Sequence, residues 1–165
     1  MLREDHREAA KRVADNSKQA LEEVALWLIN SFIDNILDIV AYTSAEMWDE
    51  VGMRLSEKGL EDPSTDDILA VLEDMSDKVD FDKSIEYAKS AGLAGRVAET
   101  MLSIGIRIAK RFANRELIQK FTYDKVLEQA KKRNIDKVVN YLVKYPRLTR
   151  KMIDWLRDKM LSEMQ

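Results

Sequence analysis

The chain has 165 residues, of which 45% are hydrophobic and 35% charged, a composition typical of one globular domain rather than a disordered chain. It contains no cysteine, which excludes disulfides, thiolate metal sites and a cysteine nucleophile and suits a reducing, cytoplasmic location. The net charge of −3 averages two opposed halves: residues 1–92 hold 10 Lys/Arg against 22 Asp/Glu, and residues 93–165 hold 17 against 8. We therefore expect a single domain, residues 1–165, with an acidic and a basic half.

The sequence of the acidic half predicts four helices. Residues 2–42 form the first, whose apolar part, residues 24–42, is interrupted by Asn30, Asp34, Asn35 and Asp38. A membrane span needs about 20 nearly unbroken apolar residues, so this segment predicts a core helix and no membrane association. The spacing Thr43-x-x-Glu46 predicts a capping box that begins the second helix.

Glycine and proline mark the boundaries that follow. Gly59 is expected to end the second helix, and Asp62-Pro63 to begin the third, because proline is tolerated at the first helical position. The third helix has an apolar face of period 3.6, formed by Ile68, Leu72, Met75 and Val79. Asp80 or Asp82 can cap a short fourth helix, which extends through Tyr87 and ends near Gly92.

The basic half continues the helical pattern. Residues 93–113 predict a strong helix with a row of small side chains that lets a neighbouring backbone approach closely; these are Ala94, Ala98, Gly105 and Ala109. Thr122 can cap the next helix, residues 135–143 predict another that ends at Pro146, and residues 148–163 predict the last. No segment reads as a strand. We therefore expect an all-α, compact bundle of about seven helices.

One internal similarity suggests a duplicated helical hairpin. Residues 81–89 align with residues 123–131 at an offset of 42, with Asp, Lys, Glu, Ala and Lys in common. Stacked helical repeats have periods of about this length. Two copies are too few for an array, and these residue types are common at helix starts, so an unrelated pair of helices remains the alternative.

Candidate binding residues lie in the basic half. Spacings of 11, 4 and 4 residues place Arg96, Arg107, Arg111 and Arg115 on one helix face. Contacts with phosphates release counterions and give affinity that does not depend on sequence, and arginine forks onto phosphate oxygens. The alternative is a solvated surface, or pairing with the acidic half. The candidate nucleic-acid-binding residues are Arg96, Arg107, Lys110, Arg111, Arg115, Lys131, Lys132, Arg133, Lys144, Arg147, Arg150 and Lys151.

Residues 139–156 resemble part of a helix-turn-helix domain. In that family one helix ends at a proline-containing turn, here at Pro146, and a Thr-Arg-Lys start, here residues 149–151, opens the second. The resemblance covers about 18 residues and implies that Arg150, Lys151 and Arg157 of the last helix would face a DNA groove. An ordinary helical hairpin is the alternative.

The acidic middle raises a catalytic alternative. Residues 46–82 hold 13 carboxylates against three basic side chains. The pairs Glu46-x-x-Asp49 and Asp74-x-x-Asp77 are similar to the magnesium site of all-α NTP pyrophosphatases, although the residue types depart from that family's pattern. The resemblance implies a Mg²⁺-dependent nucleotide hydrolase, whereas a solvated acidic surface is the simpler interpretation. His6 is the only histidine, which excludes a catalytic triad and a His-containing zinc cage.

These observations lead to a non-catalytic hypothesis. We expect a nucleic-acid-binding helical subunit or domain whose basic half follows the phosphate backbone and whose acidic half meets a protein partner. The alternative is a structural protein that self-associates, or docks a partner, through its oppositely charged ends. We expect no cofactor, no resident metal and no small-molecule substrate, and the sequence leaves DNA and RNA equally open as ligands.

Overall fold

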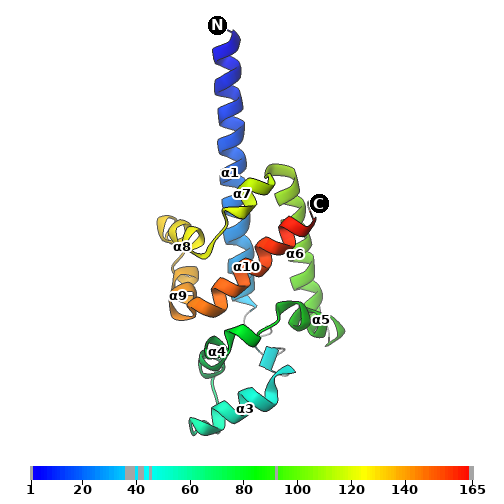
Figure 1. Ribbon diagram of the computed structural model, residues 1–165, viewed down its shortest axis with the longest axis vertical. Coiled ribbons are helices and arrows are strands. Elements are labelled where there is room, and N and C mark those ends of the chain that lie inside the picture. Colours follow the sequence, from blue (N-terminus) through cyan, green and yellow to red (C-terminus); the bar gives the residue numbers. More distant parts are fainter. Residues whose placement is uncertain (1, 36–39, 41–42, 45, 92, 164–165) are drawn as a thin grey trace.

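A computed structural model describes residues 2–35, 40, 43–44, 46–91 and 93–163 (Figure 1). These residues form nine α-helices, one 3-10 helix and no strand, which confirms the all-α class. The elements in chain order are α1 (Leu2–Asp34), α3 (Trp48–Glu57), α4 (Thr65–Asp74), the 3-10 helix η1 (Ser76–Lys78), α5 (Phe81–Ala91), α6 (Leu93–Phe112), α7 (Arg115–Gln119), α8 (Tyr123–Lys132), α9 (Asp136–Lys144) and α10 (Pro146–Glu163).

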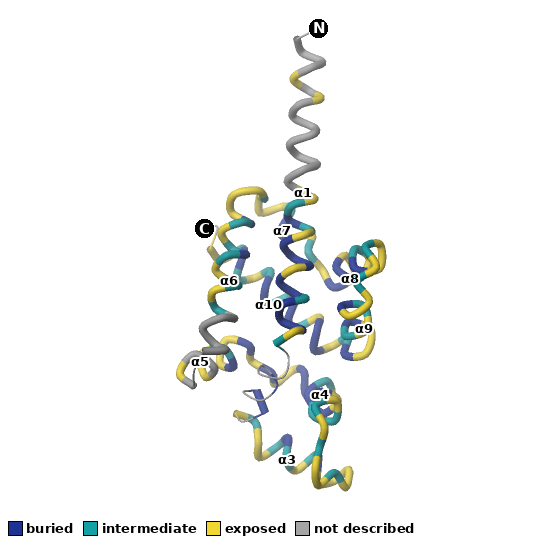
Figure 2. The backbone as a smooth tube through the Cα atoms, turned by 180° about the vertical axis from the view of Figure 1, so that it is seen from behind, coloured by how far each residue is buried: buried dark blue, intermediate teal, exposed yellow. Residues whose placement is uncertain are grey.

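Helices α1 and α10 form the centre of the molecule. Helix α1 packs against α6 on one side and against α8 and α9 on the other, while α10 contacts α4, α6, α7, α8 and α9 (Figure 1). Buried positions concentrate on α10 and on the second half of α1, as Figure 2 shows. The first half of α1 extends away from the other helices (Figure 1).

Apolar side chains from both halves of the chain close the core. Leu72 of α4, Leu142 of α9 and Ile153 of α10 belong to one cluster, although they are distant in the sequence. A second cluster joins α1, α6, α7 and the end of α10 through Leu28, Ala109, Ile118 and Met160. In the part of the chain that the structure describes, no helix combines the length and the hydropathy that a membrane crossing requires.

Two predicted helix starts differ from the structure. Helix α4 begins after Ser64, whose hydroxyl accepts a hydrogen bond from the amide of Asp67 while the Asp67 carboxylate accepts one from Ser64, so Pro63 lies outside the helix. Thr43 does not cap α3, which follows Met47; its hydroxyl instead shares a buried hydrogen bond of 2.8 Å with the hydroxyl of Ser84. A buried hydroxyl needs a partner, and Ser84 supplies one from α5.

Several other boundaries agree with the sequence, but two helices end earlier than predicted. Helix α1 ends at Asp34 rather than at residue 42, and α4 ends at Asp74, so Met75 and Val79 lie beyond it. Asp80 caps α5 and Thr122 caps α8, since their side chains accept hydrogen bonds from the amides of Lys83 and Lys125. Helix α3 ends at Glu57 with Lys58 as its C-cap, and Gly59 follows with a φ of 74°, the left-handed conformation that glycine adopts without strain. Helices α5 and α8 begin at Phe81 and Tyr123, the first residues of the two aligned segments, and the duplication stays a prediction.

The small-residue row of α6 brings that helix close to α1. A Cβ added at Gly105 would lie only 2.6 Å from Cδ1 of Leu28, a side chain that is fully buried. Ala109, one turn further along, is 1% exposed. Gly105 and Ala109 therefore serve packing within the chain. The side chains of Ala94 and Ala98 lie outside the described residues.

Candidate nucleic-acid interface

The predicted basic residues lie in three places rather than on one surface. One group is on α6 and α7, a second is at the end of α8, and a third is on α9 and the start of α10. Helix α6 lies on one side of α1 and the pair α8 and α9 lies on the other, so the first group is separated from the other two (Figure 1). The side chain of Arg96 lies outside the described residues.

The first group holds Arg107, Arg111 and Arg115, which we call the arginine row. The prediction that Arg115 shares a helix face with the other two is wrong, because α6 ends at Phe112 and Arg115 opens the separate helix α7 after the extended residue Asn114. All three are exposed, and among the described residues none has a carboxylate within ion-pair distance. The guanidinium of Arg111 lies 5.3 Å from the centre of the Phe112 ring. Lys110 is on the neighbouring face, 3.8 Å from Glu163, and this pair is exposed on both sides. The arginine row is thus a local positive surface.

The second group is partly neutralised by α1. Arg133 lies 3.8 Å from Glu22 and 3.9 Å from Glu23, and the neighbouring Lys137 pairs with Asp34. Lys131 and Lys132 are exposed, with no ion pair among the described residues. They lie in the last turn of α8, where the helix dipole favours positive charge. This group is therefore bound more closely into the fold than the arginine row.

The third group contacts α4, and two aromatic side chains, Tyr145 and Tyr123, lie against its basic residues. Lys144 lies 3.5 Å from Asp66, which also accepts a hydrogen bond of 2.9 Å from the hydroxyl of Tyr145. The Tyr145 side chain and then Asp66 raise the pKa of Lys144, whereas burial raises the pKa of Tyr145 itself. Arg150 lies 4.5 Å from the centre of the Tyr123 ring.

Helix α10 exchanges charged contacts with α4 and η1 across the boundary between the two halves. The two carboxylate oxygens of Glu73 accept hydrogen bonds, both of 2.8 Å, from the backbone amides of Arg147 and Leu148 in the first turn of α10. In return, Nζ of Lys151 donates to the carbonyl oxygens of Ser76 and Asp77, both at 2.8 Å. The Glu73 carboxylate satisfies two amides that the N-terminus of α10 leaves without helical partners, whereas the Lys151 ammonium adds a charged donor to carbonyl oxygens of η1, of which that of Ser76 also accepts from the amide of Val79.

Asp82 of α5 makes a third link to α10. Its carboxylate lies 2.7 Å from Lys159 and accepts a hydrogen bond of 3.1 Å from the indole nitrogen of Trp155. The hydrogen bond from Lys159, followed by the one from Trp155, holds the pKa of Asp82 below its ordinary value. We call the contacts of α4, η1 and α5 with α9 and α10 the charge interface.

The helix-turn-helix interpretation meets a structural obstacle at α10. Of the three side chains expected to read a groove, Lys151 is held by η1, and Arg157 donates to the carbonyl of Phe121 and pairs with Asp154. Arg150 alone is exposed. Helix α10 is a packing element, since Ile153 and Leu156 on its inner face are buried.

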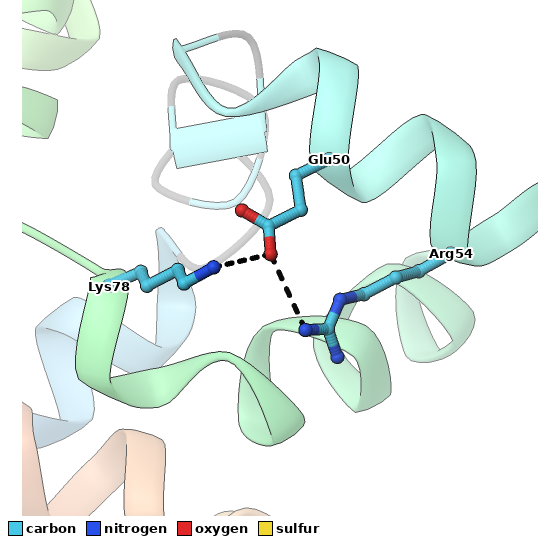
Figure 3. A network of polar contacts seen from close by, with 3 residues as sticks. All are labelled: Glu50, Arg54 and Lys78. Carbon is cyan, nitrogen blue, oxygen red and sulfur yellow. Dashed lines mark hydrogen bonds and ion pairs between the residues drawn. The ribbon is translucent and has the colours of Figure 1, made fainter.

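Ion pairs connect the elements of the acidic middle, residues 46–82. Glu50 of α3 lies 2.6 Å from Lys78 and 3.4 Å from Arg54, so it joins α3 to η1 (Figure 3). The Lys78 ammonium lowers the pKa of Glu50. The pairs considered for magnesium are separately engaged: Glu46 faces Lys83, and Asp74 faces Lys58. Within the described residues, no group of three or more potential ligands is close enough to hold a metal.

A shallow groove between α1 and α6 was not predicted from the sequence. It has a volume of about 330 Å³ and is lined by Ala20, Glu23, Val24, Trp27, Ile104, Ile108 and Phe112. Trp27 and Phe112 are each 42% exposed. The sequence pattern does not show that both residues lie at the edge of the contact between α1 and α6. A larger pocket, about 660 Å³, surrounds the exposed Trp48 of α3.

Comparison of the chain with protein-family models, with curated proteins and with solved structures finds no match.

Proposed function

We propose that this protein binds nucleic acid without catalysing a reaction, and that the arginine row contacts the phosphate backbone. The observation that carries the proposal is the absence of carboxylate partners around Arg107, Arg111 and Arg115 within the described residues. The charge interface, by contrast, gives Lys144, Lys151 and Lys159 partners inside the protein. The arginine row therefore remains available to an external anion, as do the exposed Lys131 and Lys132 at the end of α8.

The geometry of α6 suits a repeating anion. Arg107 and Arg111 are one turn apart, which is about 6 Å along the helix axis. Each guanidinium can donate two parallel hydrogen bonds to one phosphate, and such charge-assisted bonds are stronger than neutral ones. A local positive field attracts a polyanion even though the whole chain is acidic, because charges beyond about 10 Å are screened at ordinary ionic strength.

The test is a salt series of binding to labelled DNA and RNA. With three to four phosphate contacts, the logarithm of the binding constant should fall against the logarithm of the salt concentration with a slope of about −3. The triple variant Arg107→Ala/Arg111→Ala/Arg115→Ala should reduce that slope to about −1 and weaken binding to every sequence equally.

A charge-matched variant provides the control. Lys58→Ala/Lys83→Ala/Lys125→Ala removes the same charge from three exposed lysines outside the candidate site, each of which makes only a surface ion pair. Binding should be unchanged in this variant. If both triple variants weaken binding equally, net charge alone is responsible and the proposed site is wrong. If the wild-type protein does not bind at low salt, the proposed function is wrong.

A separate observation favours self-association as a second candidate function. Helix α1 has 33 residues, and its first half extends away from the other helices (Figure 1), whereas the buried side chains that the structure describes on this helix lie from Leu21 onward. Helices shorter than about 15 residues are marginal in water without packing, so this half gains stability from a second copy. Light scattering over a range of concentrations and salt tests this candidate. A monomer at every concentration would contradict it.

A further inference from the structure

We propose that the groove between α1 and α6 receives unpaired bases, and hence that the preferred ligand is a single strand rather than a duplex. This inference rests on the proposed function, since it assumes that the arginine row binds phosphates. It adds a second kind of contact, apolar and aromatic, that only a strand with accessible bases can make.

The groove has the composition that base binding requires. It is lined by the aromatic side chain of Trp27 on α1 and by Ile104, Ile108 and Phe112, which follow one another every four residues on α6. Stacking on aromatic side chains contributes strongly to the binding of single strands and tolerates any sequence, because every base has a π-face. The volume of about 330 Å³ is at the lower end of the range for small-molecule pockets, which suits a flat base.

The groove and the arginine row are adjacent. Phe112 lines the groove, and the guanidinium of Arg111 lies 5.3 Å from the centre of its ring. A strand that places phosphates on Arg107 and Arg111 therefore has its bases within reach of the groove. Glu23 also lines the groove, but its carboxylate lies 3.9 Å from Arg133, which offsets the negative charge.

A duplex cannot use this arrangement. Its bases are stacked and paired inside the helix, so that it presents to the arginine row the same phosphates but no free π-faces. The charges alone would bind single and double strands comparably. The groove is what should separate them.

The experiment compares labelled single strands of roughly 12 nucleotides, as DNA and as RNA, with a duplex of the same length. We expect the wild-type protein to bind the single strands at least tenfold more tightly than the duplex. The variants Trp27→Ala and Phe112→Ala should each lose about tenfold or more of single-strand affinity, keep their affinity for the duplex and keep the salt slope. Trp48→Ala is the matched control, because Trp48 is 54% exposed and lies outside the groove.

A direct readout is tryptophan fluorescence. Single strands should quench the emission of the wild-type protein and of Trp48→Phe, whereas the quenching should disappear in Trp27→Phe. Circular dichroism of each variant excludes loss of folding as the cause.

The outcomes separate the two proposals. Equal affinity for single and double strands, or unchanged affinity in Trp27→Ala and Phe112→Ala, overturns the groove while the arginine row stands. Failure of the wild-type protein to bind any of the three ligands overturns the proposed function and the groove with it. A preference for the RNA over the DNA strand, with loss in both groove variants, supports the groove and identifies the natural ligand as RNA.

Discussion

The charge interface and the arginine row use the same residue types for opposite purposes. In the charge interface, Glu73 and Lys151 lie against the ends of α10 and of α4–η1, and Asp82 lies against Lys159. On α6 and α7, Arg107, Arg111 and Arg115 face solvent without carboxylate partners among the described residues. The difference is not in the basic residues themselves but in what the fold places opposite them.

This comparison shows how an excess of charge should be interpreted. The 17 basic residues of positions 93–165 suggest a single positive surface. In the structure, part of this charge joins the acidic and basic halves into one molecule. Only the remainder is available to a ligand, and it includes the arginine row, although α6 itself packs against α1 and α5 of the acidic half.

The largest expected effect on stability tests the packing of α6, which carries part of the arginine row, against α1. Leu28→Ala should lower the free energy of unfolding by about 2–5 kcal/mol, because it leaves a cavity in a fully buried position. Gly105→Ala forces a methyl group against Leu28 and should also destabilise. In the double variant the methyl group partly fills the cavity, so urea denaturation should give a smaller loss than the sum. Additive losses would mean that the two residues are not in contact.

The next effect tests the charge interface from its acidic side. Glu73→Ala removes the carboxylate that caps α10 and should lower the free energy of unfolding by about 1–2 kcal/mol. Glu61→Ala is the control, because Glu61 is exposed on the same half of the chain. Equal stability of the two variants in urea denaturation would show that the cap does not hold the halves together.

The contact of Lys151 with η1 should contribute less to stability than the cap that Glu73 provides. Lys151→Met keeps the apolar stem but removes the ammonium that binds the carbonyls of Ser76 and Asp77, which should cost about 1 kcal/mol. Lys132→Met, at an exposed position in the last turn of α8, should cost less. A loss at Lys132 as large as that at Lys151 would remove the distinction between structural and free lysines.

The pH dependence of stability sharpens the comparison further. Because the pKa of Asp82 is lower in the folded protein than in the unfolded chain, the stabilisation is fully present above the ordinary pKa of about 3.9. It is lost as the pH falls through the lowered value. Melting temperatures measured from neutral pH down to pH ~2 should therefore fall less steeply for Asp82→Asn than for the wild-type protein. Parallel curves would contradict this role of Asp82.

The smallest effect belongs to the arginine row itself. The variant Arg107→Ala/Arg111→Ala/Arg115→Ala should unfold within about 0.5 kcal/mol of the wild-type protein, since exposed residues without partners contribute little to stability. Removal of like charges one turn apart on α6 offsets part of any loss. Destabilisation as large as that of Glu73→Ala, measured in the same urea series, would show that these arginines have structural partners.

Local signals made much of the fold predictable. Hydrophobic period identified the helices, and short-range caps such as Asp80, Thr122 and Gly59 identified their ends. The errors at helix starts had two causes, a competing local signal at the start of α4 and a long-range contact at Thr43. Ser64 and Asp67 formed a capping box immediately after the Asp62-Pro63 signal, and Thr43 satisfied its hydroxyl through Ser84, which is 41 residues away.

The candidate site was less predictable because it depends on distant neighbours. Helical spacing placed Arg107 and Arg111 on one face, but no local pattern shows that Lys151 would be held by η1, 74 residues earlier. The same limit applies to the groove. Trp27 and Phe112 follow apolar stripes, and only the packing of α1 on α6 leaves them partly exposed.

The central position of α10 has a consequence for biosynthesis. The amides that Glu73 caps belong to residues 147 and 148, and α10 also completes contacts with α6, α7 and α8. The ribosome must therefore release residues 146–163 before α4 and η1 acquire their contacts with α10. Until then the apolar side chains of α4 that face α10 stay open to solvent, and their burial depends on slow closure of a long loop.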